Sequence, residues 1–136
     1  NIIGVKDATG SMERATMQRN KLGKEFILLS GDDSTALGFN AHGGHGCISV
    51  TSNVAPRLCA QMQELSLAGD FNAARDINDK LAFLHKDLFM EPNPAPAKYV
   101  ANRLKLCANE MRLPLTPISK PTQDAMDFAM RHAGLI

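Results

Sequence analysis

Three short, mainly apolar runs constrain what this chain can fold into more than any other feature of its sequence. They span residues 2–5, 26–29 and 46–50, and polar or glycine residues follow each of them at once. Continuous apolar runs of this kind are typical of strands that are buried on both faces of a parallel sheet. The segments that connect the runs carry helical patterns, so the sequence predicts an α/β chain built from three consecutive βα units.

After the third run the sequence is helical in pattern. Pro56 suits the first turn of one helix, and the next helix carries an apolar stripe at separations of three or four residues. The stripe consists of Phe71, Ala74, Ile77, Leu81, Leu84 and Leu88. The prolines within residues 91–96 end this helix. A further helix is expected to continue through Val100 and Cys107, and the last one runs to His132.

The predicted sheet is too small to stand alone. Three parallel strands leave unpaired backbone groups along an open edge, and an eight-stranded barrel would supply the missing strands. The chain also begins on an apolar run and without Met. We therefore expect it to be a piece of a longer protein.

Charge and cysteine content exclude several classes of protein. Lys and Arg number 15 against 14 Asp and Glu, which gives a net charge of +1 and none of the basic excess expected of a nucleic-acid binder. No apolar run approaches the ~18 residues of a membrane-spanning helix. The three cysteines form no CxxC pair, which favours a reducing cytoplasm over a disulfide framework.

Lys6 directly follows the first apolar run. In a barrel the carboxyl ends of the strands form the active face. Apolar neighbours would remove solvent from the ammonium group and favour the neutral amine, which attacks carbonyl groups to form an imine. The alternative is a lysine at an exposed strand end with no catalytic role, and position alone favours that alternative.

Two other segments contain residues that bind metals or transfer protons. Asp32 and Asp33 follow the second run, where they suit either a metal or acid–base site or the cap of a helix. His42, His45 and Cys47 surround a glycine-rich turn, and their spacing does not suit a closed zinc site. We predict a structural turn there and no bound metal. His85 and His132 are expected on a solvated helix face.

Read together, several segments resemble the dihydrodipicolinate synthase family. Gly4-Val5-Lys6-Asp7-Ala8-Thr9-Gly10 is similar to that family's Schiff-base lysine segment, and residues 29–33 are similar to its next strand end. Residues 43–56 resemble its last strand. The resemblance continues through residues 89–94 and 113–117 to residues 132–136, so that it covers the whole chain.

The resemblance implies a (β/α)8 TIM barrel with a C-terminal helical appendage. Residues 1–69 would hold strands six to eight with their helices, and residues 70–136 would form the C-terminal α-helical region. The family condenses pyruvate with L-aspartate 4-semialdehyde to 4-hydroxy-tetrahydrodipicolinate, in the diaminopimelate pathway to lysine. Lys6 would form the imine with pyruvate, while the backbone carbonyl of Ile48 and the region of Gly31 would line the pyruvate pocket. This chemistry needs no metal or organic cofactor.

The resemblance also implies partners. The family's threonine for the pyruvate carboxylate, its proton-relay tyrosines and its lysine-feedback site come from the N-terminal half of the barrel, and Tyr99 cannot take the relay role. Family members are commonly homotetramers built as a dimer of dimers. Two alternatives stay open: a sister lyase acting on N-acetylneuraminate or a keto-deoxy sugar acid, and a non-catalytic fragment or assembly partner. The run of residues 48–56 favours the synthase.

Overall fold

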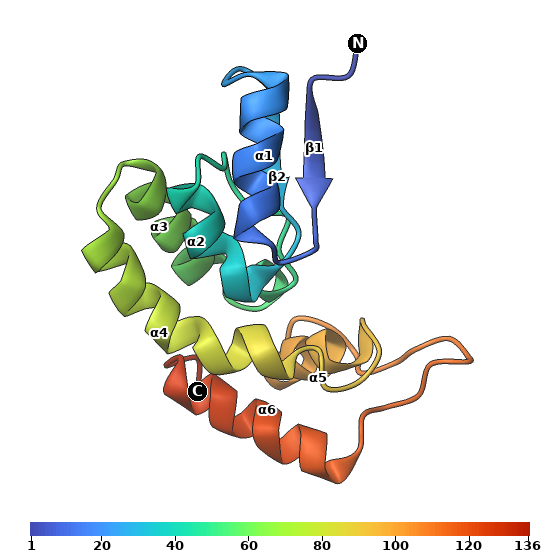
Figure 1. Ribbon diagram of the computed structural model, residues 1–136. Helices are drawn as coiled ribbons and strands as arrows, with labels where there is room; N and C mark the ends of the chain where they lie inside the picture. Colours follow the sequence, from blue (N-terminus) through green and yellow to red (C-terminus); the bar gives the residue numbers. More distant parts are fainter. The chain divides into compact units, whose positions relative to one another are not determined.

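The computed structural model describes all residues, 1–136, and its sheet consists of two parallel strands. Strand β1 (Gly4–Asp7) is connected to β2 (Ile27–Ser30) through helix α1 (Met12–Leu22), which confirms the first predicted βα unit. Figure 1 shows α1 alongside the two strands. Ser11 caps α1 by accepting a hydrogen bond from the backbone N–H of Arg14, at 3.3 Å.

The third predicted strand is shorter than expected. Cys47 forms only an isolated parallel bridge with Ser30. Around this bridge, three backbone hydrogen bonds of 2.8–2.9 Å hold residues 45–48 beside β2. Gly46 has a φ of +143°, far from strand values, and the chain then turns into the 3₁₀ helix η2 (Thr51–Asn53). The prediction of a strand over the whole of residues 46–50 is therefore wrong in extent.

The other regular elements are helices, as predicted. The further elements are η1 (Asp33–Thr35), α2 (Ala36–Ala41), α3 (Pro56–Leu67), α4 (Phe71–Asp87), α5 (Ala95–Arg103) and α6 (Lys120–His132). Helix α5 ends before Cys107, contrary to expectation, because Lys105 adopts the left-handed conformation with a φ of +62°. None of these helices is both long and apolar enough to cross a membrane.

The chain packs as two compact units. The first comprises residues 1–49 and 60–78, and the second comprises residues 50–59 and 79–136. The predicted boundary between residues 69 and 70 concerns the full barrel and stays a prediction.

Each unit has its own core of buried side chains. In the first unit the buried apolar side chains belong to two clusters, which are Ala15, Leu28 and Phe39, and Ala36, Met62 and Ala74. The second unit buries the later part of the predicted stripe together with residues of α5 and α6, namely Leu81, Leu84, Leu88, Val100, Met126 and Met130.

Candidate active site

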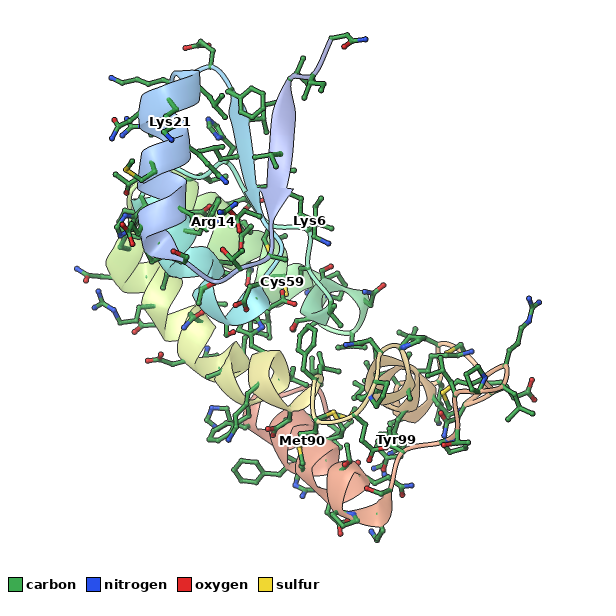
Figure 2. All side chains as sticks on the ribbon, turned by 45° about the vertical axis from the view of Figure 1, so that its right-hand side comes forward. Lys6, Arg14, Lys21, Cys59, Met90 and Tyr99 are labelled. Carbon is green, nitrogen blue, oxygen red and sulfur yellow. The ribbon has the colours of Figure 1, made fainter.

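Lys6 lies near the carboxyl end of β1, where it pairs with Leu29 of β2. Side chains alternate between the two faces of a strand. Figure 2 accordingly shows Lys6 on one side of this strand end and Arg14 of α1 on the other. The strand thus presents Lys6 on the sheet face that α1 does not cover.

An open depression of about 310 Å³ lies on this face. It is lined by Ile3, Gly4, Val5, Lys6, Ile27, Leu29 and Ile48. The structure thus brings Ile48 to the same depression as Lys6. Lys6 is nevertheless exposed, and so are Ile27 and Ile48. The expected desolvation of the amine by its apolar neighbours is not found, because these neighbours themselves lie on an uncovered sheet face.

Gly31, which follows β2, lies close to the side chain of Lys6. A Cβ atom built at Gly31 would lie 2.5 Å from Lys6 Cε and 2.7 Å from Ala8 Cβ. The backbone N–H of Gly31 donates a hydrogen bond to the carbonyl of Asp7, at 2.8 Å. The three residues for which the resemblance implies site roles, Lys6, Ile48 and Gly31, therefore share one corner of the sheet.

Asp7 is a residue of this corner that the sequence analysis did not single out. Its carboxylate is buried and accepts four hydrogen bonds: from the Thr9 N–H at 2.9 Å, Thr9 Oγ1 at 2.6 Å, Arg14 Nε at 2.8 Å and Gln18 Nε2 at 2.8 Å. Burial raises the pKa of Asp7, but these hydrogen bonds outweigh burial and hold the pKa well below its usual range. An Asp two residues before a Thr at a strand end is the local signal of such a turn.

The adjacent carboxylates at the end of β2 take different positions. Asp32 accepts hydrogen bonds from the Ser34 N–H at 3.0 Å and from Ser34 Oγ at 2.6 Å, so it caps η1 as the capping interpretation expects. Asp33 is buried and accepts a hydrogen bond from Ser49 Oγ. Neither the metal or acid–base interpretation nor the capping interpretation of Asp33 included a contact with Ser49.

The glycine-rich segment after α2 forms a turn, as predicted. His42 Nδ1 lies 2.9 Å from Thr16 Oγ1, and His45 Nδ1 accepts a hydrogen bond from the backbone N–H of Leu28, at 3.1 Å. Gly43 has a φ of +92°, which favours glycine. No group of three or more His, Cys, Asp or Glu side chains in residues 1–136 is arranged to hold a metal ion. That the protein needs no metal stays a prediction.

His85 and Tyr99 are both buried in the second unit. His85 was expected on a solvated face, but it is 2% exposed, and its Nδ1 lies 2.8 Å from Thr51 Oγ1. Tyr99 donates a hydrogen bond to Asp127 Oδ1 at 3.1 Å, and Arg103 donates one to Asp127 Oδ2 at 2.8 Å. Tyr99 therefore ties α5 to α6.

A strand-end lysine, a glycine packed close to its side chain and a parallel βα unit make up the candidate site, and comparison with known proteins gives the family. Residues 1–133 match the model of the Dihydrodipicolinate synthetase family, and the chain belongs to that family. It is 58% identical over 136 residues to 4-hydroxy-tetrahydrodipicolinate synthase of Parvibaculum lavamentivorans, and 59% identical to that of Brucella suis. It covers 47% and 46% of these relatives, so it spans about half of their length.

Solved structures give the same result for the fold. Dihydrodipicolinate synthase of Aquifex aeolicus is 39% identical with a TM-score of 0.94 over 99% of this chain and 46% of that one. The chloride-inhibited enzyme of Acinetobacter baumannii, complexed with pyruvate, is 38% identical with a TM-score of 0.95 over 100% of this chain and 47% of that one. The chain thus has the α/β fold of about half of a dihydrodipicolinate synthase.

Proposed function

We propose that this chain carries the imine-forming half of a 4-hydroxy-tetrahydrodipicolinate synthase, which condenses pyruvate with L-aspartate 4-semialdehyde. The observation that carries the proposal is the position of Lys6: it lies at a parallel strand end, beside an open depression shared with Ile48. The 58% identity of the whole chain to a synthase supports the choice of reaction.

Lys6 is the nucleophile of the proposed reaction. Its Nζ attacks the keto carbon of pyruvate, and loss of water leaves an imine. The imine withdraws electrons from the neighbouring methyl carbon, which loses a proton and gives an enamine. The enamine carbon attacks the aldehyde carbon of the semialdehyde. The amine of the resulting adduct then attacks the imine carbon, closes the ring and releases Lys6.

Ile48 and Gly31 line the pyruvate pocket in this proposal. The role of Ile48 falls to its backbone carbonyl, and it is supported because Ile48 lines the same depression as Lys6. The role of Gly31 is supported because a Cβ atom built there would meet the Lys6 stem. No metal or organic cofactor takes part, because the imine itself accepts the electrons of the breaking C–H bond. Tyr99 takes no part in proton relay, since its hydroxyl is held by Asp127.

The site is completed by the other half of a (β/α)8 barrel. In the proposed protein, residues 1–69 hold strands six to eight and residues 70–136 form the helical appendage. The missing half supplies the carboxylate-binding threonine and the relay tyrosines. The exposed apolar side chains Ile27 and Ile48, at 37% and 50% exposure, support a covering layer on this sheet face. The full protein is a homotetramer, a dimer of dimers, and works in the cytoplasm.

A chimera tests the proposed reaction. This chain replaces the matching segment of the Parvibaculum lavamentivorans synthase, to which it aligns over its whole length. We expect the chimera to condense pyruvate with aspartate semialdehyde and not to cleave N-acetylneuraminate. Lys6→Arg, which keeps the charge, should abolish condensation because a guanidinium group does not form the imine.

The isolated chain is the second arm of the same experiment. It should show no condensation, since loss of general acid–base groups alone costs ~10²–10⁴ in rate. A folded chimera that cleaves N-acetylneuraminate and does not condense would assign the chain to the sister lyases. A chimera with neither activity, made from an active parent, would make the chain a non-catalytic homologue.

A further inference from the structure

We propose that Gly31 is a positioning residue for Lys6: the absence of a side chain at Gly31 leaves the space in which the aliphatic stem of Lys6 lies, and this fixes where its amine meets pyruvate. The inference rests on the proposed function, and it gives Gly31 a role beyond lining the pocket.

Space, and not backbone conformation, requires glycine at this position. The φ angle of Gly31 is not among the positive values that Gly10, Gly43 and other turn glycines adopt. A Cβ atom at Gly31 would instead lie 2.5 Å from Lys6 Cε and 3.1 Å from Lys6 Cγ. Real Cβ atoms essentially never approach another heavy atom as closely as the first of these distances. The aliphatic stem of Lys6 therefore occupies the space that a side chain at residue 31 would need.

Hydrogen bonds hold the two backbone segments together and oppose a shift that would make room for a methyl group. The Gly31 N–H donates to the Asp7 carbonyl at 2.8 Å, and Asp7 pairs with Ser30 in the sheet. The Asp7 carboxylate in turn is held by Arg14 and other donors. Because the backbone is held on both sides, a methyl group at Gly31 should displace the side chains above it, which are those of Lys6 and Ala8.

Displacement of the Lys6 stem moves the reacting amine. A misplacement of about 1 Å at a reacting group costs as much as ~10² in rate. The loss should appear in the rate of imine formation at saturating pyruvate. The melting temperature should change little, because only one corner of the sheet is affected.

The experiment uses the active chimera with three variants. Gly31→Ala adds the methyl group. Gly31→Ala combined with Ala8→Gly removes the conflict with Ala8 and keeps the one with Lys6. Gly38→Ala is the matched control: it adds a methyl group in α2 of the same unit, where the Cβ meets only the flexible Met12 side chain, at 3.1 Å from its sulfur. Imine formation with saturating pyruvate is followed by rapid quenching with borohydride, beside kcat, KM and the melting temperature.

We expect Gly31→Ala to slow imine formation by ~10²-fold, the double variant to stay equally slow, and Gly38→Ala to keep the parental rate. A parental rate in Gly31→Ala would overturn the inference, as would recovery in the double variant, since the cost would then come from Ala8. Loss of folding in both Gly31 variants would make Gly31 a requirement of the fold and would also overturn it. If the parent chimera itself forms no imine, the proposed function fails and the inference falls with it.

Discussion

At the scale of single residues, the neighbours Lys6 and Asp7 lie on opposite faces of the sheet at the end of β1. Lys6 points to the open face, while the Asp7 carboxylate is buried on the side of α1 and accepts hydrogen bonds from Arg14, Gln18 and Thr9. Each of these hydrogen bonds favours the ionised form of the carboxylate. The Asp7 carboxylate thereby links the end of β1 to α1 and to the following turn.

Replacing Asp7 by Asn should therefore destabilise the chimera. The substitution removes an ionised acceptor and sets an amide N–H against donors, at an expected cost of about 1–3 kcal/mol in the free energy of unfolding at neutral pH. Asp124→Asn is the control, because Asp124 forms an exposed pair with Lys120 that contributes little. Urea titration measures both changes. Equal stability of Asp7→Asn and the parent would contradict the role of Asp7.

The stability difference between the parent chimera and Asp7→Asn should depend on pH. Since the pKa of Asp7 is lowered in the folded state, its contribution is fully present above the ordinary carboxyl pKa of about 4 and is lost as the pH falls towards the lowered value. The stability difference between parent and Asp7→Asn should be constant from pH 7 to about pH 5 and shrink below pH ~4. A difference that grows on acidification would show that the sign is wrong.

The sequence could reveal a residue's role only where the interactions of that residue follow a local sequence pattern. Lys6 could be singled out because a strand end is a local pattern. The partners of Asp7 come from the following turn and from α1, and His85 meets Thr51 from 34 residues away. No periodic pattern encodes contacts of that kind.

At the scale of elements, helices were predicted best where their apolar stripes are long. The stripe of α4 is confirmed by the burial of Leu81, Leu84 and Leu88. The end of α5 was missed because Lys105 takes the left-handed position that usually belongs to glycine. The hydrogen bond from the Leu106 N–H to the Ala101 carbonyl, at 2.9 Å, closes the helix there.

The contact between α5 and α6 gives a further prediction, on stability. Burial raises the pKa of Tyr99, and the Asp127 carboxylate, which accepts its hydrogen bond, raises it further. Tyr99→Phe should cost about 0.5–1.5 kcal/mol, because Asp127 keeps Arg103 as a donor. Asp127→Ala should cost more, since it leaves the Tyr99 hydroxyl buried without its acceptor.

Both variants should keep the parental rate of condensation, measured beside their unfolding by urea. A large loss of kcat in Tyr99→Phe without a loss of stability would place Tyr99 in the reaction. That result would contradict its assignment as a tie between two helices.

At the scale of the whole molecule, the chain has one sheet face covered by α1 and one face that carries Lys6 and exposed apolar side chains. Ile3 and Ile48 are 72% and 50% exposed there. The chain spans about half of its relatives, and its family matches run through both units. In the function proposed above, this open face becomes a pyruvate site when a barrel closes over it, and Lys6 is the residue that binds pyruvate covalently.

Peptide mapping of borohydride-trapped pyruvate tests that claim most directly. The chimera is incubated with pyruvate and borohydride, digested, and analysed by mass spectrometry. We predict one reduced pyruvyl group on Lys6, and none on that peptide when pyruvate is left out. A label on another lysine, such as Lys21 or Lys24, or no label in a chimera that still catalyses the condensation, would contradict the account.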